Sequence, residues 1–265
     1  MIELPDVERM IESFAGYTTG KTISTVIIDD PELVEVPTEA AENHLESHAV
    51  ASVERHGKSV VLAFRSGYSL VFDLGDEGLL TLESQTTPSE DDTRMRLQFA
   101  AGRELRFDSP GATGGVHVVE GHDFSGLGEL GDLGIDPLSD DLTEERFAKL
   151  AEDNPRISLK GFLMNQKIIA GIGNEYADEI CFQAGFRPDT KVGNMQPHQL
   201  ERVHRYLRRV LRRATLHWEA AHSDPGWLIN YRSSGEPCPR CRSSLKSISV
   251  TGRKTFICPR CQRAA

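Results

Sequence analysis

The C-terminal end of the sequence carries four cysteines in two closely spaced pairs. Cys238 and Cys241 form one Cys-x-x-Cys pair, and Cys258 and Cys261 form a second pair after sixteen intervening residues. Each pair can present two thiolates from one tight turn, and the spacing allows a β-hairpin to bring the pairs together. The pattern predicts one structural Zn²⁺ ion. Four protein ligands leave no position for a catalytic water, so we expect the site to stabilise a fold.

A glycine-containing turn lies between two helical patterns in the second half of the chain. Gly171 and Gly173 stand in this turn, and Asn174 follows them. Glycine permits positive φ angles and close approach of the backbone to another molecule. Asn174 can cap the next helix, whose free N-terminal amides would suit a phosphate. A plain helical hairpin would show the same local residues, so both interpretations stay open.

Charge is distributed unevenly along the chain. Residues 1–141 contain 9 Lys and Arg against 28 Asp and Glu, a net charge of −19. Residues 142–265 contain 21 against 12, a net charge of +9, and the two halves give the total of −10. This asymmetry indicates a basic binding module attached to an acidic domain. Alternatively, the acidic half only keeps the protein soluble, or it reflects a cytoplasm with a high salt concentration.

The elements that position these residues follow from apolar periodicity and from turn residues. A first helix begins near Pro5 and is ended by Gly16 and Gly20. Residues 23–119 alternate β-like segments with Gly, Pro and Asp turns, which is typical of a β-sandwich or barrel. A glycine-rich stretch over 121–141 then offers capping residues at 137–141. The later helices are predicted over 143–151, 159–169, 174–184 and 199–217.

The sequence lacks the signals of a membrane or exported protein. No run approaches the roughly 20 apolar residues that a membrane span requires. The first six residues contain acids and a proline where a signal peptide would have basic and then apolar residues. We therefore expect a cytoplasmic protein. In that compartment clustered cysteines indicate metal rather than disulfides, and Cys181 is expected to be a buried apolar residue.

Several segments resemble the Fpg/Nei family of damaged-DNA glycosylases. Residues 165–188, NQKIIAGIGNEYADEICFQAGFRP, are similar to its helix–two-turn–helix signature, and residues 235–262 resemble its zinc finger. Residues 3–7 resemble the ELPEV opening, and residues 55–58 resemble a strand-borne RRGK motif. Residues 136–139, in the linker, also resemble the family's sequence. Because these segments keep the family's order, the chain is identified as a divergent member.

The resemblance implies an α+β fold with an N-terminal β-sandwich, a leading helix, a helix–two-turn–helix domain and a zinc-ribbon finger. On this basis the β-sandwich domain is expected over 1–122, and a linker over 123–141. The helix–two-turn–helix domain is expected over 142–228, and the zinc finger over 229–265. Double-stranded or damaged DNA would lie across the cleft between the domains. We expect the chain to be a monomer that associates with the nucleoid when bound.

The resemblance also implies a reaction in which a damaged base is flipped out of the duplex. The N-terminal amine of residue 2 attacks the sugar C1′, expels the base and forms a Schiff base, after which elimination cleaves the strand. Ile2 would supply this amine if Met1 is removed. Glu3 would act as the general acid for the sugar. Lys58 is a conceivable substitute nucleophile.

The family's DNA-binding surface maps onto five positions. The counterpart of Asn174 holds a backbone phosphate, as does that of the finger residue Arg253. Gly171 and Gly173 shape the turn beside Asn174. Lys58 would meet a phosphate next to the lesion, which is the role we favour for it over nucleophilic attack.

The chain departs from the family at one functional surface. Ile2 replaces proline, and methionine removal generally requires a smaller second residue. Asp76 stands where the family has a methionine that fills the space left by the flipped base. Gly111 and Ala112 stand where the family has two arginines, and the following phenylalanine is also missing. These differences predict altered or abandoned chemistry.

Three functions therefore remain open. The chain can be a base-excision-repair glycosylase, with or without lyase action at abasic sites. It can be a non-catalytic zinc-dependent protein that binds damaged DNA or structured nucleic acid. It can also be an interaction protein whose acidic domain docks another protein. Borohydride trapping detects the imine of the first, and salt-dependent DNA binding separates the second from the third.

Overall fold

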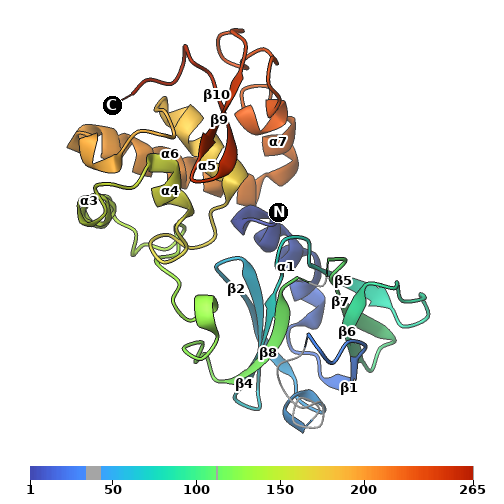
Figure 1. Cartoon of the computed structure of the whole chain (residues 1–265). Helices are drawn as coiled ribbons and strands as arrows, with labels where there is room; N and C mark the ends of the chain where they lie inside the picture. Colours follow the sequence, from blue (N-terminus) through green and yellow to red (C-terminus); the bar gives the residue numbers. More distant parts are fainter. Residues whose placement is uncertain (34–42, 112, 265) are drawn as a thin grey trace. The chain divides into compact units, whose positions relative to one another are not determined.

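The computed structural model describes residues 1–33, 43–111 and 113–264 (Figure 1). The chain forms two compact units, each described here by itself. The first unit comprises Met1–Ile2 and Asp6–Asp132, and the second comprises Glu3–Pro5 and Leu133–Ala265. Among the described residues, no helix has the length and apolar character needed to cross a membrane.

The first unit is built from two four-stranded antiparallel sheets and most of helix α1, Leu4–Thr18. One sheet has the strand order β1-β6-β7-β5, and the other has the order β2-β3-β4-β8. The strands are β1 Ile23–Ile28, β2 Val50–His56, β3 Ser59–Phe64, β4 Tyr68–Asp73, β5 Leu79–Ser84, β6 Thr93–Phe99, β7 Arg103–Asp108 and β8 Gly115–Glu120. A short 3₁₀ helix, η1, spans Gly128–Leu130.

Both sheets contribute to one apolar core, as expected for a sandwich. The rings of Phe72 in β4 and Phe107 in β7 lie 5.4 Å apart between centroids, and the core also contains Phe14 of α1. The predicted β-sandwich with a leading helix is therefore confirmed. The predicted end of the helix was wrong in one detail, because Gly16 lies inside α1. Gly20, with φ of +80°, follows the end of the helix.

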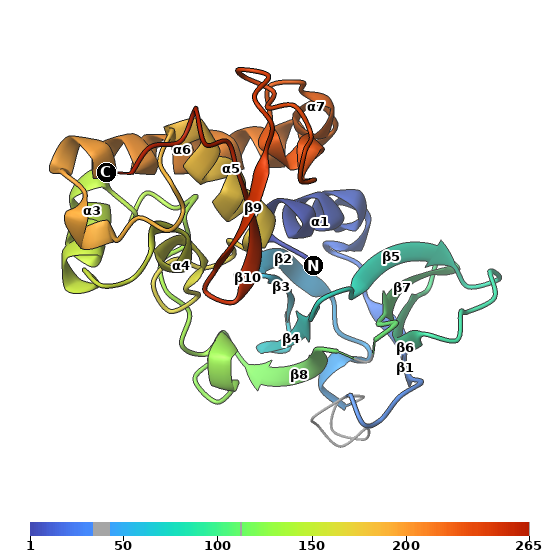
Figure 2. The ribbon, with the colours of Figure 1, turned by 45° about the horizontal axis from the view of Figure 1, so that its top comes forward.

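The second unit contains five described helices and a two-stranded antiparallel hairpin. The helices are α3 Glu144–Asp153, α4 Leu159–Met164, α5 Asn174–Ala184, α6 Pro197–Leu216 and α7 Trp218–Ser223. Two 3₁₀ helices, η2 and η3, span Val192–Asn194 and Leu228–Tyr231. The hairpin consists of β9, Lys246–Val250, and β10, Arg253–Ile257. Figure 2 shows this hairpin projecting away from α6.

Two predictions for this unit need correction. The side chain of Thr143 caps α3 by accepting a hydrogen bond from the Arg146 amide, so none of residues 137–141 serves as the cap. Helix α4 ends at Met164 instead of residue 169, because the amides of Ile168 and Ile169 bond to the carbonyl of Asn165 and begin a separate turn. The apolar face of α6 is buried.

Candidate functional site

The turn between α4 and α5 is held together by one side chain, that of Gln166. Its Nε2 donates to the carbonyls of Met164 and Ile172, at 2.8 Å each, and its Oε1 accepts from the Gly171 amide at 2.8 Å. Gly171 has a φ of +86°, which a residue with a Cβ rarely adopts. Gln166 was not among the predicted site residues, because only the folded turn shows which backbone groups its amide reaches.

The Glu3 carboxylate lies at the N-terminus of α5. Its Oε2 accepts from the amides of Gly173 at 2.8 Å and Tyr176 at 3.1 Å, and its Oε1 accepts from Glu175 at 2.7 Å. The Leu4 amide donates to the Gly171 carbonyl at 2.9 Å, which fixes the backbone next to Glu3. Glu3 is only 1% exposed. The helix dipole and three amides therefore stabilise a buried carboxylate.

Gly173 is required at this position by the carboxylate itself. A Cβ on Gly173 would lie 2.4 Å from Cδ and 2.6 Å from Oε1 of Glu3, far inside van der Waals contact. The backbone of Gly173 is extended, so the restriction comes from space rather than from the φ angle. The structure thus brings Glu3, Gly171 and Gly173 together.

The predicted capping role of Asn174 is wrong. Gly173 is the N-cap residue, Asn174 is the first residue of the helix, and the Glu3 carboxylate accepts hydrogen bonds from amides that would otherwise suit a phosphate. The Oδ1 atom of Asn174 is buried and has no hydrogen-bond partner among the described residues. Sequence reasoning missed this arrangement because the acid that replaces the cap is about 170 residues away.

Two other predicted site residues belong to the first unit. The Ile2 nitrogen donates to the Asp76 carbonyl at 3.2 Å, and the Ile2 side chain packs against the apolar core. Met1 is 50% exposed, and the Asp76 side chain is exposed. Lys58 is half-buried in the turn between β2 and β3. Ala112, one of the substituted positions, lies outside the described residues.

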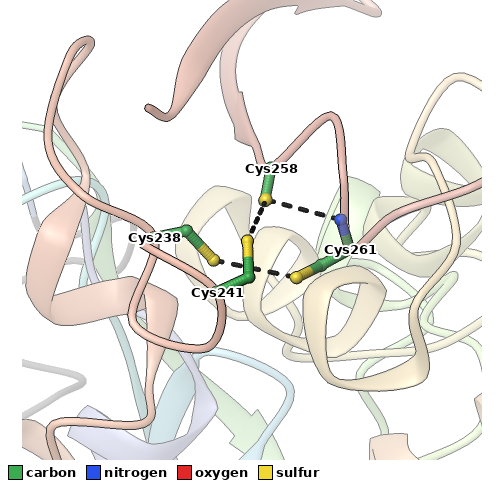
Figure 3. Close-up of side chains that lie close together, drawn as sticks. All are labelled: Cys238, Cys241, Cys258 and Cys261. Atoms are coloured by element: carbon green, nitrogen blue, oxygen red, sulfur yellow. Dashed lines mark hydrogen bonds between the residues drawn. The ribbon is translucent and has the colours of Figure 1, made fainter. Parts of the chain in front are cut away.

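The four C-terminal cysteines converge on one point, as Figure 3 shows. Their Sγ atoms all lie within 4.8 Å of one another, with Cys238 and Cys261 at 3.9 Å and Cys241 and Cys258 at 3.5 Å. A tetrahedral zinc ion with Zn–S bonds of about 2.3 Å separates its sulfurs by about 3.8 Å. The cluster therefore fits one structural zinc ion.

The thiols of this cluster differ in how readily they ionise. Hydrogen bonds from Ser243 lower the pKa of Cys241 to about 6, whereas burial raises the pKa of Cys258. Thiols must ionise to bind zinc, so metal affinity is expected to weaken in acid. The ion would hold the hairpin and supply no open coordination position.

The zinc finger packs against α5. Leu228, Leu245 and Phe182 of α5 form a small apolar cluster with Cys238 and Cys258. The guanidinium of Arg240 lies 4.6 Å from the centroid of the Phe182 ring. This packing places the finger beside the helix that carries the Glu3 site.

The tip of the hairpin presents a cation. Gly252, with φ of +73°, turns the chain between β9 and β10, and the exposed Arg253 follows it. None of the described residues forms a hydrogen bond or ion pair with its guanidinium. Cys181, the fifth cysteine, is buried in α5, where burial raises the pKa of its thiol.

Three family models match this chain in succession. The formamidopyrimidine-DNA glycosylase N-terminal domain matches residues 1–116, and the H2TH domain of the same enzyme matches residues 133–222. A zinc finger found in Fpg and isoleucyl-tRNA synthetase matches residues 235–264.

Whole-chain comparisons agree with these matches. The formamidopyrimidine-DNA glycosylases of Marinobacter nauticus and Bacillus cereus are 32% and 28% identical to it, over 99% of this chain and 100% and 99% of theirs. The fold is that of Lactococcus lactis Fpg in complex with DNA containing N7-benzyl-Fapy-dG, with a TM-score of 0.87 at 24% identity, covering 98% of this chain and 99% of that one. With its three domains matched in order and relatives at this identity along its whole length, the chain belongs to the formamidopyrimidine-DNA glycosylase family.

Proposed function

We propose that this chain is a base-excision-repair DNA glycosylase that also cleaves abasic sites, and that it acts on damaged bases in double-stranded DNA. The observation that carries the proposal is the Glu3 carboxylate, which three amides of the α5 N-terminus hold directly after residue 2. Relatives along the whole chain are formamidopyrimidine-DNA glycosylases, which supports this reaction class. We also propose that it works as a monomer in the cytoplasm, on the nucleoid.

The proposed reaction begins with a nucleophilic amine. Its nitrogen lone pair forms a bond to C1′ of the flipped nucleotide, while the glycosidic bond breaks and its electron pair leaves with the base, which takes up a proton. The C1′–O4′ bond then breaks to give a C=N bond, and the Glu3 carboxylate takes a proton from the attacking nitrogen and passes it to O4′. Loss of a C2′ proton and of the 3′ phosphate cleaves the strand.

Ile2 supplies the amine in this proposal, once Met1 has been removed. With Met1 in place the Ile2 nitrogen is a peptide nitrogen, whose lone pair is delocalised into the carbonyl and is not nucleophilic. Lys58 is the substitute nucleophile, although contact with a phosphate beside the lesion is its proposed main role.

The second unit provides the remaining DNA contacts in this proposal. Asn174 at the start of α5 and Arg253 at the hairpin tip each hold a backbone phosphate, and Gly171 and Gly173 shape the turn. Residues 142–265 carry a net charge of +9, which favours a polyanion. The exposed guanidinium of Arg253 is suited to bidentate contact with phosphate oxygens.

The test is the intact mass of the natively expressed protein, before and after borohydride treatment with DNA containing an abasic site. We expect the mass of the chain without Met1, together with a covalent DNA adduct, because borohydride reduces the C=N bond. The Glu3→Gln variant should bind the DNA and yield roughly 100-fold less adduct per minute. Lys58→Met should still form the adduct.

A different result would change the assignment. Retained Met1 and no adduct, with DNA binding intact, would overturn the Schiff-base mechanism and leave a DNA-binding relative or a glycosylase that uses water. Release of a damaged base without any adduct would identify a glycosylase that uses water. Loss of the adduct in Lys58→Met alone would transfer the nucleophilic role to Lys58.

A further inference from the structure

A set of buried polar contacts connects α5 to the zinc-finger hairpin. Its centre is Asp178, which lies one helical turn after Asn174. The Oδ1 atom of Asp178 accepts from Lys160 Nζ at 2.6 Å. Its Oδ2 accepts from Arg232 Nη1 at 2.8 Å and from the Phe256 amide at 3.1 Å. The side chains of Lys160 and Asp178 are completely buried.

These contacts extend to a specific residue at each end. Arg232 Nη1 also donates to the Asn174 carbonyl at 3.3 Å. At the other end Lys160 Nζ donates to Thr255 Oγ1 at 2.6 Å, and Thr255 Oγ1 donates to the Arg253 carbonyl at 3.1 Å. The buried network, meaning Lys160, Asp178, Arg232 and Thr255, therefore runs from Asn174 to Arg253. Those two residues are the proposed phosphate contacts.

Stability alone is a poor reason for charges at this depth. Removing an ion pair from water costs free energy that the attraction within the pair often fails to recover. Burial raises the pKa of Asp178 and lowers that of Lys160, so the surroundings oppose both charged forms. Apolar side chains of similar volume would fill the space without this cost. The charged groups instead contribute directional hydrogen bonds, and each bond fixes the relative position of the two groups that it joins.

The backbone of α4 also packs closely against the hairpin. Gly161, next to Lys160 in α4, approaches the hairpin turn so closely that a Cβ would lie 3.0 Å from Cγ2 of Thr251. Figures 1 and 2 both show β10 beside α5. The hairpin is therefore held against α4 and α5 by packing as well as by the buried network.

We propose that Lys160, Asp178 and Thr255 are positioning residues, which set the spacing between the Asn174 and Arg253 phosphate contacts before DNA binds. This inference rests on the proposed function. A hairpin already held in place loses little conformational freedom on binding, so the second phosphate contact forms at a small entropic cost. Without the network, Arg253 remains present and must be ordered by the DNA.

Thr255→Val tests this with little change of shape, since it removes the hydroxyl that joins Lys160 to the Arg253 carbonyl. Binding to a duplex with a stable abasic-site analogue is measured over a range of salt concentrations. Arg253→Ala should lower the log–log salt slope by about 0.9, the value for one phosphate contact. We expect Thr255→Val to weaken binding by up to roughly tenfold, and to weaken the Arg253→Ala protein no further.

Lys160→Met provides a second variant, with zinc content and thermal unfolding measured so that only folded protein is compared. Its matched control is Lys149→Met, which removes an exposed lysine that pairs with Asp153 on α3. Lys160→Met should weaken binding, by no more than Arg253→Ala does, and Lys149→Met should leave binding unchanged. Folded Lys160→Met and Thr255→Val proteins with wild-type affinity and salt slope would overturn the positioning role.

Failure of the underlying function has a different signature. If Arg253→Ala itself binds like the wild type, Arg253 holds no phosphate, and both assignments fall. If Arg253→Ala weakens binding while the network variants do not, only the network inference is overturned. The inference is also overturned if Thr255→Val weakens binding by the same factor in the Arg253→Ala protein as in the wild type, because independent effects add.

Discussion

The four-cysteine cluster and the Glu3 site lie in the same unit and are built in opposite ways. The cluster takes its ligands from side chains within 24 residues of one another, on two tight turns. The Glu3 site joins one side chain at the start of the chain to three backbone amides about 170 residues away. The cluster depends on residue type and spacing, whereas the Glu3 site depends on where a helix begins.

This difference separates stability from chemistry. Four thiolates close the zinc site and leave it inert, so its effect reaches DNA only through the position of the hairpin. The Glu3 carboxylate is stabilised by N–H groups that keep their geometry for as long as α5 is folded. The two sites should therefore respond differently to removal of zinc, to a larger side chain in the site and to a change of pH.

Removal of zinc by a chelator should have the largest effect. Zinc contributes roughly 10–16 kcal/mol to the folding of small finger peptides, so residues 235–264 should lose their structure and DNA binding should be abolished. Hydrogen exchange should show fast exchange in β9 and β10 and retained protection for the amides of Gly173 and Tyr176. Cys181→Ala, which changes a cysteine outside the cluster, should keep one zinc ion per chain.

Loss of protection at Gly173 and Tyr176 after zinc removal would contradict this independence. It would mean that α5 itself depends on the finger, and the two sites would then form a single structural unit.

Gly173→Ala should affect only the Glu3 site. The added methyl group would overlap the Glu3 carboxylate, so we expect a loss of roughly 1–3 kcal/mol in the free energy of unfolding. Adduct formation should fall as Glu3 moves, while zinc content stays at one ion per chain. Urea unfolding and borohydride trapping measure the two effects.

The matched control for this change is Gly16→Ala. Gly16 lies inside α1, and a Cβ there would meet no atom within 4 Å, so the substitution should stabilise the protein by about 0.5–1 kcal/mol. A Gly173→Ala protein as stable and as active as the wild type would show that the carboxylate does not need its position on α5.

Glu179 offers a smaller, pH-dependent comparison with Glu3. Its carboxylate is buried in α5 and accepts from the Ile229 amide at 2.8 Å and from Gln183 Nε2 at 2.6 Å. Burial raises the pKa of Glu179 from 4.5 to about 7. The contribution of Glu179 to the free energy of unfolding is complete below pH 4.5 and is lost as pH rises through about 7. The loss should be roughly 1–3 kcal/mol.

Glu179→Gln should remove this pH dependence, because glutamine does not titrate. Urea unfolding at pH 5.5 and pH 8 should show a smaller stability difference in the variant than in the wild type. Glu152→Gln changes an exposed acid on α3 and should keep the wild-type difference. An unchanged difference in Glu179→Gln would assign the pH dependence to other groups.

Much of the fold and part of the site could be predicted because local patterns encode them. Period-3.6 apolar patterns located α5 and α6, and the cysteine spacing located the zinc hairpin. The end of α4 was mispredicted because Ile168 and Ile169 continue its apolar pattern. Hydrogen bonds to Asn165 and to the strand-like segment at Ile135 end the helix instead.

By itself, the sequence determined the family, the zinc ligands and the order of the elements, since these depend on residue type and spacing along the chain. The tertiary structure alone decided what holds the α5 N-terminus, which role Gln166 plays in the turn and how Asp178 connects Asn174 to Arg253. In each case the partner is a backbone group or a residue distant in sequence. Such contacts leave no periodicity, because they exist only once the chain has folded.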